Sequence, residues 1–217
     1  MIEIIPTVVP KSVRDVAALC ARFPAVSLFH IDATDGAFAF PTTWVPSAGE
    51  QLPDGPLFEA HLMAEDPRAA GERFIRAGAW RIIGHAEALQ GEDGISTLAG
   101  WRAMGAHEVG IALKLDSPLS LVEHLAPHAD VLHLMTIRKV GAQGQPFDTE
   151  SLDRIADARA RFPRLVIAAD GGISETNIPD LIRAGVSRLC IGSALSRADE
   201  PAAAFARMHE LAMSAVQ

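Results

Sequence analysis

The stretch LFEAHLMAEDPRAAGERFIRAGAWRIIGHAE, residues 57–87, predicts a β-strand, an α-helix and a second β-strand. Residues 57–63 and 81–87 are short apolar runs of strand length, whereas the apolar residues between them recur at three- and four-residue steps. Ala77-Gly78 comes just before the second run, where a glycine can adopt the left-handed conformation that ends a helix. A strand, a helix and a strand in this order favour parallel pairing of the two strands.

The same alternation extends along the whole chain. Eight strand-like runs occur, at residues 3–9, 26–32, 57–63, 81–87, 109–115, 131–137, 165–171 and 187–193. Helical periodicity follows most of them, at residues 13–23, 67–79, 120–126, 149–162 and 177–186. Several runs are almost wholly apolar, as expected of a parallel sheet that is covered on both faces. The pattern predicts an α/β fold, a single (β/α)8 TIM barrel that forms one domain over residues 1–217.

A doubly wound open sheet is the alternative fold. Its GxGxxG fingerprint would follow the first strand, but this strand runs into Pro6-Thr7-Val8-Val9-Pro10. The barrel is therefore preferred. Within it, residues 41–56 are rich in proline and are expected to be mostly loop.

The charge and composition of the chain argue against several classes of function. The chain carries a formal net charge of −8 and no basic stripe, so nucleic-acid binding is not expected. No apolar run approaches the length of a membrane span, and the first residues, MIEIIP, do not form a secretory signal. Cys20 and Cys190 lie far from any CxxC pair and are expected to be reduced thiols. We therefore expect a cytoplasmic protein with no nucleic-acid partner and no membrane partner.

Four metal-capable side chains lie near the C-terminal ends of predicted strands. His30 and Asp32 occur in FHID, His61 in EAHLM and Asp170 in AADGG. His30 and Asp32 face the same side of their strand, because residues i and i+2 of a strand share a face. Barrels of this class build their sites at the C-terminal strand ends. The four predict a site for one divalent metal ion (Zn, Mn, Fe or Co), although a single strand-end histidine is more often a hydrogen-bonded structural residue.

The two carboxylates also suit proton transfer. Asp32 and Asp170, on the second and seventh strands, could approach a flat substrate from opposite faces, one removing a carbon-bound proton and the other delivering one. That geometry inverts a stereocentre through an enediolate, which a divalent ion would stabilise. Gly171-Gly172 and Gly192-Ser193 expose backbone N–H groups after the last two strands, where barrels often bind phosphate. Together with the metal set, they predict a phosphorylated substrate, and Met63 is expected to border its pocket.

Eight strand-end motifs in register extend this interpretation. They are HID-x-x-DG at 30–36, AHLM at 60–63, HAEA at 85–88, GIALKLDSPL at 110–119, LMT at 134–136, GQPF at 144–147, DGGI at 170–173 and GSA at 192–194. In this order the sequence resembles the ribulose-phosphate 3-epimerase family of metal-dependent (β/α)8 enzymes over nearly its whole length. The resemblance implies a homo-oligomer. It also implies that the metal ligands are His30, Asp32, His61 and Asp170, and that the catalytic acid–base residues are Asp32 and Asp170. The substrate-binding residues that it implies are Thr7, Gly171, Gly172, Gly192 and Ser193.

The chain departs from the family pattern at positions that are expected to lie in the substrate pocket. Thr34 stands where the family commonly has methionine, so a hydroxyl would replace an apolar shield beside the reacting carbon. Lys114 stands where the family usually has asparagine. The loop at 135–147 has one extra residue, and its Arg138 and Lys139 could supply charge to a phosphate or carboxylate.

We therefore expect an isomerase of carbohydrate metabolism that inverts C3 of a phosphorylated ketose, with the pentose phosphates ribulose 5-phosphate and xylulose 5-phosphate as the first pair. One alternative is an epimerase for another ketose phosphate, such as allulose 6-phosphate or a tetrulose phosphate. Another is a non-catalytic sugar-phosphate-binding barrel.

Two other reaction classes are less favoured. Related barrels that decarboxylate sugar phosphates use an Asp-x-Lys-x-x-Asp arrangement, and Thr34 occupies the lysine position here. Because Lys114 could form a Schiff base with a carbonyl substrate, an aldolase is the second of these alternatives. Of the remaining histidines, His85 is expected either to line the site or to make a structural hydrogen bond, and His133 to be a packing residue.

Overall fold

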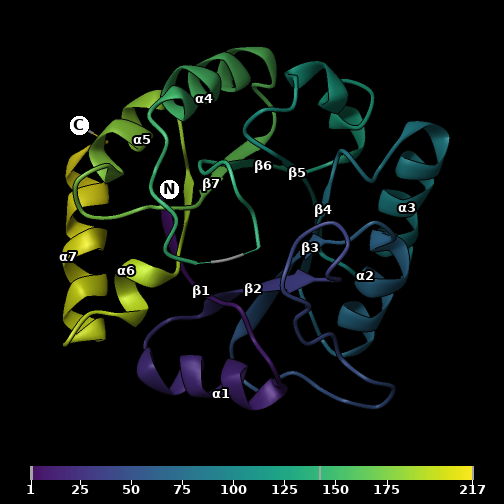
Figure 1. The fold of residues 1–217 in the computed structure, drawn as a ribbon, viewed down its shortest axis with the longest axis horizontal. Helices are drawn as coiled ribbons and strands as arrows, with labels where there is room; N and C mark the ends of the chain where they lie inside the picture. The colour runs from purple at the N-terminus through teal and green to yellow at the C-terminus, as the bar shows by residue number, and fades with distance from the viewer. Residues whose placement is uncertain (1, 142, 217) are drawn as a thin grey trace.

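Eight parallel strands close into a barrel with the helices around it in the computed structural model, which describes residues 2–141 and 143–216 (Figure 1). Each strand pairs with the next in sequence, and β8 pairs with β1. The strands are β1 (Glu3–Val8), β2 (Leu28–Thr34), β3 (Leu57–Met63), β4 (Arg81–His85), β5 (Glu108–Leu113), β6 (Val131–Met135), β7 (Val166–Asp170) and β8 (Arg188–Ile191). The predicted (β/α)8 barrel is confirmed, and the pairing of β8 with β1 excludes an open sheet.

Helices connect the strands on the outside of the barrel. They are α1 (Val13–Arg22), α2 (Pro67–Arg76), α3 (Gly91–Ala103), α4 (Glu150–Arg161), α5 (Ile178–Ala184), α6 (Ser193–Ser196) and α7 (Pro201–Ser214), with the short 3-10 helices η1 (Leu119–Val122) and η2 (Ala126–His128). Over residues 2–141 and 143–216, none of these helices has both the length and the apolar character needed to cross a membrane.

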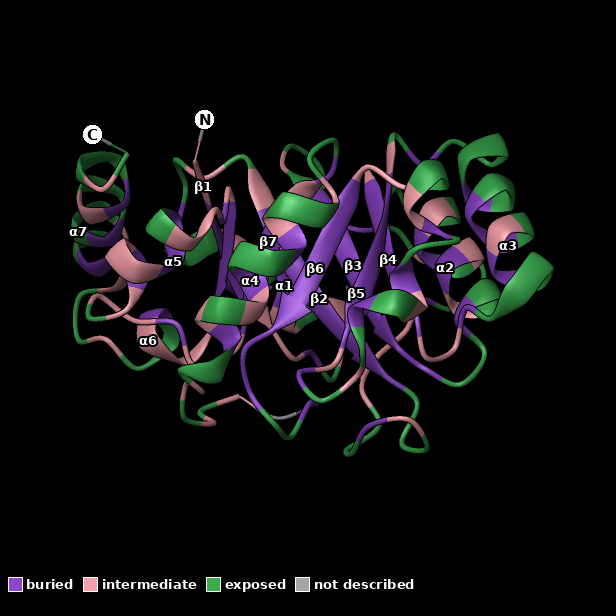
Figure 2. Ribbon diagram, turned by 90° about the horizontal axis from the view of Figure 1, so that it is seen from above, coloured by how far each residue is buried: buried purple, intermediate pink, exposed green. Residues whose placement is uncertain are grey.

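Side chains along each strand alternate between two environments, because successive strand residues point to opposite faces. In β2, Phe29 and Ile31 belong to the apolar core between the sheet and the helices. His30 and Asp32 point into the barrel, where they contact side chains from other strands. Figure 2 shows strands that are almost entirely buried and helices that are exposed on their outer side. The main apolar core therefore lies outside the barrel, and polar side chains occupy much of its interior.

Glycines end two helices as predicted. Gly78 and Gly185 have φ values of 99° and 110°, in the left-handed region where a residue without Cβ is unstrained. The N–H of Gly185 donates to Ile182 O at 3.0 Å, which closes the last turn of α5. Residues 41–56 contain neither helix nor strand, as their prolines predicted, and residues 35–40 likewise form irregular loop.

The α-helix predicted at residues 120–126 is wrong. The segment forms η1 and η2 instead, with hydrogen bonds from Leu121 N–H to Pro118 O and from His128 N–H to Leu125 O. Pro127 has no N–H with which to continue an α-helix, and it disfavours the helical conformation in the residue before it. Two short 3-10 helices therefore replace the predicted α-helix, and the second of them contains Pro127.

Helices α2 and α3 pack against each other through Gly71 and Trp101. The Trp101 side chain is buried, and a Cβ placed on Gly71 would lie 2.5 Å from Trp101 Cε2. We expect Gly71→Ala to lower the free energy of unfolding by about 1–3 kcal/mol, because the enclosed ring has little room to move. Urea denaturation measures the change.

Gly100→Ala is the matched control for that substitution. Gly100 lies within α3, and a Cβ there would meet nothing within 4 Å. Alanine should therefore raise the free energy of unfolding by about 0.4–1 kcal/mol through its lower entropy in the unfolded chain. If both alanine variants were stabilised equally, the close contact between Gly71 and Trp101 would be refuted.

Two loops cover the C-terminal ends of the strands. The loops after β2 and β6 meet at Gly141, where a Cβ would lie 2.9 Å from both Ala39 Cβ and Phe40 O. In Figure 1 the loop after β6 crosses the front of the barrel, and in Figure 2 both ends of the described chain lie on the opposite face. The strand ends that carry the predicted site residues therefore lie beneath these loops.

Candidate active site

The four side chains predicted as metal ligands lie together inside the barrel. His30 and Asp32 come from β2, His61 from β3 and Asp170 from β7. Asp32 Oδ1 lies 3.2 Å from His30 Nε2 and 3.0 Å from His61 Nδ1. Asp170 Oδ2 lies 3.6 Å from the same His61 nitrogen. All four residues are buried, so both carboxylates meet the histidines away from bulk water.

His133, which the sequence placed among the packing residues, belongs to the same cluster. Its Nε2 lies 3.4 Å from Asp170 Oδ2, and its ring stacks on that of His30 with centroids 5.3 Å apart. Donor atoms of His30, His61, His133 and Asp170 lie within 4.8 Å of one another. The available signal was strand alternation, since His133 and Met135 share the inward face of β6.

The chemistry of this cluster fits a divalent ion. Imidazole nitrogens and carboxylate oxygens are ligands that Zn, Mn, Fe and Co accept. In the part of the chain that the structure describes, neither Asp32 nor Asp170 is paired with a lysine or an arginine. Two buried carboxylates need compensating positive charge, and a metal ion would supply it.

Hydrogen bonding and burial set the charge states beside the cluster. Burial alone would raise the pKa of Asp32, but hydrogen bonds from His30 and His61 lower this pKa well below its ordinary value. Burial lowers the pKa of His85 to about 4, against the opposing effect of Glu87. His85 Nε2 lies 2.9 Å from His61 Nε2, and its Nδ1 lies 3.0 Å from Glu87 Oε2. His85 therefore makes structural hydrogen bonds, which is one of the two roles that the sequence suggested for it.

A cavity lies at the C-terminal end of the barrel, above the cluster. It is lined by Thr7, Asp32, Met63, Met135, Ile137, Gly141, Gln143, Gly144, Gln145, Asp170, Gly171, Gly172, Ile173, Cys190, Gly192 and Ser193. Both candidate proton carriers reach this cavity, as do the predicted substrate-binding residues. His30 and His61 lie behind its wall, fully buried.

The loop after β6 lies directly on the glycines that follow β7 and β8. A Cβ on Gly172 would lie 2.7 Å from Phe147 Cα, and a Cβ on Gly192 would lie 2.7 Å from Gln143 Cδ. The Gln143 side-chain amide donates to Thr7 O at 3.2 Å. Any side chain at these glycines would displace the loop, so the close packing of the loop requires glycine at both positions.

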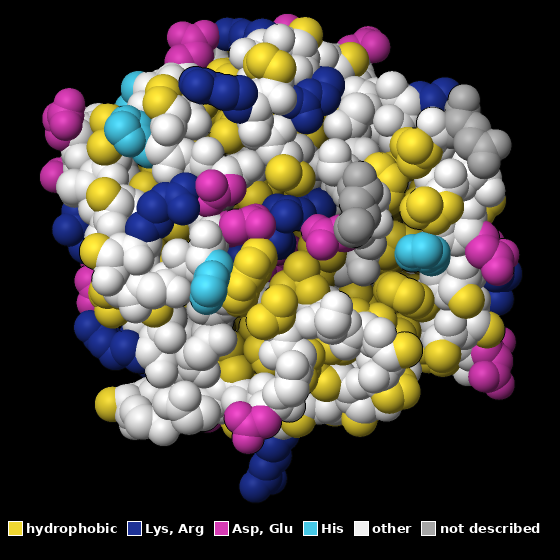
Figure 3. Space-filling model, turned by 180° about the vertical axis from the view of Figure 1, so that it is seen from behind, with side chains coloured by type: hydrophobic (Ala, Val, Ile, Leu, Met, Phe, Trp, Pro, Cys, Tyr) yellow, Lys and Arg dark blue, Asp and Glu magenta, His cyan; other side chains and the backbone are white. Residues whose placement is uncertain are grey.

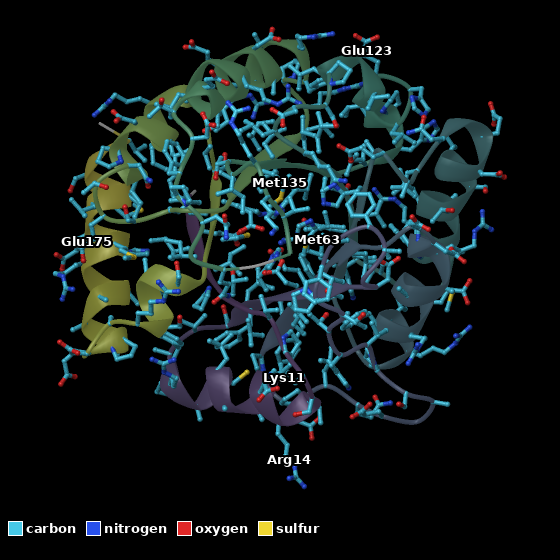
Figure 4. The ribbon with its side chains drawn as sticks, viewed as in Figure 1. Lys11, Arg14, Met63, Glu123, Met135 and Glu175 are labelled. Atoms are coloured by element: carbon cyan, nitrogen blue, oxygen red, sulfur yellow. The ribbon has the colours of Figure 1, made fainter. Side chains whose placement is uncertain are left out.

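Apolar side chains border the carboxylates on the loop side. Met63 and Met135 lie near the centre of the barrel, whereas the labelled charged residues lie at its edge (Figure 4). The two methionines form a small buried cluster with Ala39, Ile137 and Val140, which come from the covering loops. This cluster restricts water at the mouth of the cavity.

Two of the sequence departures take no part in the cavity wall. The Thr34 hydroxyl donates to Pro41 O, and the Thr34 N–H donates to Thr43 Oγ1 at 2.8 Å. The expectation that Thr34 puts a hydroxyl beside the reacting carbon is therefore wrong, since these bonds turn it to the loop after β2. Lys114 Nζ lies 3.6 Å from the centre of the Phe38 ring and also does not line the cavity.

Arg138 anchors the loop after β6. Its guanidinium lies 2.9 Å from Asp116 Oδ1, 2.8 Å from Asp148 Oδ2 and 2.7 Å from Glu150 Oε2. Three carboxylates of the protein thus take up the charge that was expected to serve a phosphate or carboxylate of the substrate. The guanidinium instead ties the loop to the start of α4.

Family and sequence comparisons identify curated relatives of the chain. Residues 4–196 match the model of the ribulose-phosphate 3 epimerase family. A ribulose-phosphate 3-epimerase of Mycobacterium bovis is 31% identical over 225 residues, covering 98% of this chain and 93% of that protein. A ribulose-phosphate 3-epimerase of Eremothecium gossypii is 28% identical over 207 residues, covering 88% of this chain and 85% of that protein.

Solved structures share the fold at lower identity. KGPDC from Streptococcus mutans superposes with a TM-score of 0.71 at 13% identity, covering 100% of this chain and 100% of that one. The 3-hexulose-6-phosphate synthase of Salmonella typhimurium gives a TM-score of 0.68 at 13% identity, covering 99% and 100%. At these identities the likeness is one of fold alone.

Proposed function

The chain belongs to the ribulose-phosphate 3-epimerase family of isomerases that act on carbohydrate phosphates, and from this we propose that it inverts C3 of a phosphorylated ketose. D-ribulose 5-phosphate and D-xylulose 5-phosphate are the first substrate and product to test. Asp32 and Asp170 are the proposed proton carriers, and one divalent ion is the proposed cofactor.

The main support for this proposal is the arrangement of Asp32 and Asp170. The two carboxylates come from strands that are not neighbours, reach the same cavity and lie within 3.6 Å of one nitrogen of His61. One carboxylate removes the C3 proton, and the electron pair moves toward the C2 carbonyl oxygen to give an enediolate. The other, protonated at the start, delivers its proton to the opposite face of C3. The reaction therefore needs one of the two aspartates ionised and the other protonated at its start.

The surrounding residues prepare this reaction. A divalent ion held by His30, Asp32, His61 and Asp170 would supply Lewis-acid stabilisation to the negative charge that develops on the substrate oxygens. Met63 and Met135 keep water from the reactive carbon, because water would protonate the enediolate without control of its face.

A phosphate group fits the glycine-lined part of the cavity. Gly171 and Gly172 after β7 and Gly192 and Ser193 after β8 present backbone N–H groups without side chains in the way. Gln143 now lies against Gly192 and would have to move aside as the phosphate enters.

The position of Gln143 supports a second substrate class as the alternative. A side chain at this wall sets how deep a ketose phosphate can enter, so an epimerase for allulose 6-phosphate or a tetrulose phosphate is the alternative. A homo-oligomer and a cytoplasmic location stay predictions.

Hydrogen exchange at C3 tests the reaction. We incubate the metal-loaded protein in D2O with ribulose 5-phosphate, allulose 6-phosphate, a tetrulose phosphate and unphosphorylated ribulose, and follow the C3 proton by NMR. Ribulose 5-phosphate should lose its C3 proton and yield xylulose 5-phosphate, whereas ribulose should not react. Turnover of a different ketose phosphate alone would change the substrate. A protein that exchanges no C3 proton of any phosphorylated ketose is not an epimerase of this kind.

A further inference from the structure

Glu59 lies directly behind the candidate metal ligand His30. Its Oε1 is 2.6 Å from His30 Nδ1, and both side chains are almost wholly buried, with 2% and 0% of their surface exposed. The other ring nitrogen of His30, Nε2, faces Asp32 at 3.2 Å. Glu59 therefore occupies the side of the imidazole that points away from the candidate metal position.

An ion network extends from Glu59 toward the surface. Its second oxygen pairs with Arg81, whose Nε is 2.7 Å from Glu108 Oε2. Arg188 contacts Glu108 at 2.8 Å and Glu3 at 2.6 Å. Figure 3, which faces the N-terminal ends of the strands, shows acidic and basic side chains next to one another near the middle of that face. Within this network Arg81 contacts Glu59 directly, whereas Glu108, Arg188 and Glu3 lie one or more contacts further away.

This contact determines which nitrogen of His30 carries the proton. A carboxylate paired with an arginine is ionised and accepts hydrogen bonds only. His30 Nδ1 must then carry a proton and donate it to Glu59, so His30 can bind a metal ion only through Nε2, the nitrogen that faces Asp32. A carboxylate behind a histidine ligand also makes its free nitrogen more basic and a stronger ligand.

A second metal site at Glu59 is the competing interpretation. His30 Nδ1, Glu59 and Cys190 offer three donor atoms within 4.8 Å of one another. The Arg81 guanidinium lies against Glu59, however. A cation there would be repelled by this fixed positive charge, so the hydrogen-bonded arrangement is favoured.

We propose that Glu59 is a positioning residue that fixes the tautomer and orientation of His30 and so strengthens metal binding at the active site. This inference rests on the proposed metal centre. It assigns a role in metal binding to Glu59, a carboxylate that does not reach the cavity and takes no part in proton transfer.

Zinc affinity tests the inference without reference to turnover. We titrate metal-free wild-type, Glu59→Gln and Glu108→Gln proteins with Zn²⁺ in competition with a chromogenic chelator. The wild type should bind one zinc per chain, and Glu59→Gln should bind it about 10–100-fold more weakly, because the carboxylate charge behind His30 is lost. Glu108→Gln is the matched control: it disturbs Arg81 and Arg188 and lowers the Tm, but should keep the wild-type affinity.

The outcomes separate this inference from the function it rests on. A wild-type chain that binds no zinc overturns both. One zinc per chain with equal affinity in wild type and Glu59→Gln, or an equal loss in both variants, overturns the role of Glu59 alone. Should Glu59→Gln not fold, NMR of the ¹⁵N-histidine-labelled, zinc-loaded wild type decides, since the proton of His30 must lie on Nδ1; a proton on Nε2 refutes the inference.

Discussion

Asp170→Asn is expected to lower kcat by about 10²–10⁴-fold, the usual contribution of a positioned acid or base. An amide at this position can neither remove nor deliver the C3 proton, although it preserves the size of the side chain. Asp32 remains able to remove a proton from the one epimer that presents it. Residual deuterium incorporation should therefore be confined to one of the two substrates, without net epimerisation.

Asp180→Asn is the control for this variant. Asp180 lies on α5, where it pairs with Arg183 at the surface, and its loss should leave kcat unchanged. The readout is C3 exchange measured separately from each epimer. Full turnover by Asp170→Asn would show that Asp170 is not one of the two proton carriers.

Removal of the metal is expected to abolish epimerisation and to lower thermal stability together. The main apolar core contains none of the candidate metal ligands, so the metal-free chain should keep its circular dichroism spectrum. An ion at about 1,000 times its Kd stabilises the folded state by about 4 kcal/mol. For a chain of this size, this corresponds to roughly 8–16 °C in Tm.

Chelation followed by readdition measures both effects on one sample. Activity and Tm should return together with Zn, Mn, Fe or Co, and Ca should restore them poorly because it prefers oxygen ligands. If dialysed protein that contains no transition metal epimerised at the original rate, the metal centre would play no part in the reaction.

The barrel could be predicted because each strand has its own local signal. Apolar runs of strand length can be recognised in isolation, and their alternation with helices limits the topology to a few choices. Helix α3 was not among the predicted segments, since Gly91, Gly94 and Gly100 weaken its helical signal. The turns at η1 and η2 were taken for one helix because periodicity alone does not distinguish a 3-10 turn from an α-turn.

The site was predicted in part. Strand-end positions and residue chemistry picked out Asp32 and Asp170, which the structure brings to one cavity. His133 and Glu59 were missed although strand alternation places them on inward faces. The orientation of Thr34 could not be read from the sequence, because it depends on hydrogen bonds to residues 41–43, whose path is set by tertiary packing.

Apolar side chains of the strands point outward and polar ones point inward, so substitutions in the barrel are expected to fall into two groups with different effects. Outward positions such as Phe29 and Ile31 contact helices, so substitutions there change how much protein folds but not what each folded molecule does. Inward positions such as His30 and Glu59 belong to or contact the His–Asp cluster of the site, so substitutions there are expected to change the chemistry of molecules that still fold. Neighbouring codons along one strand therefore govern two different properties, abundance and specific activity.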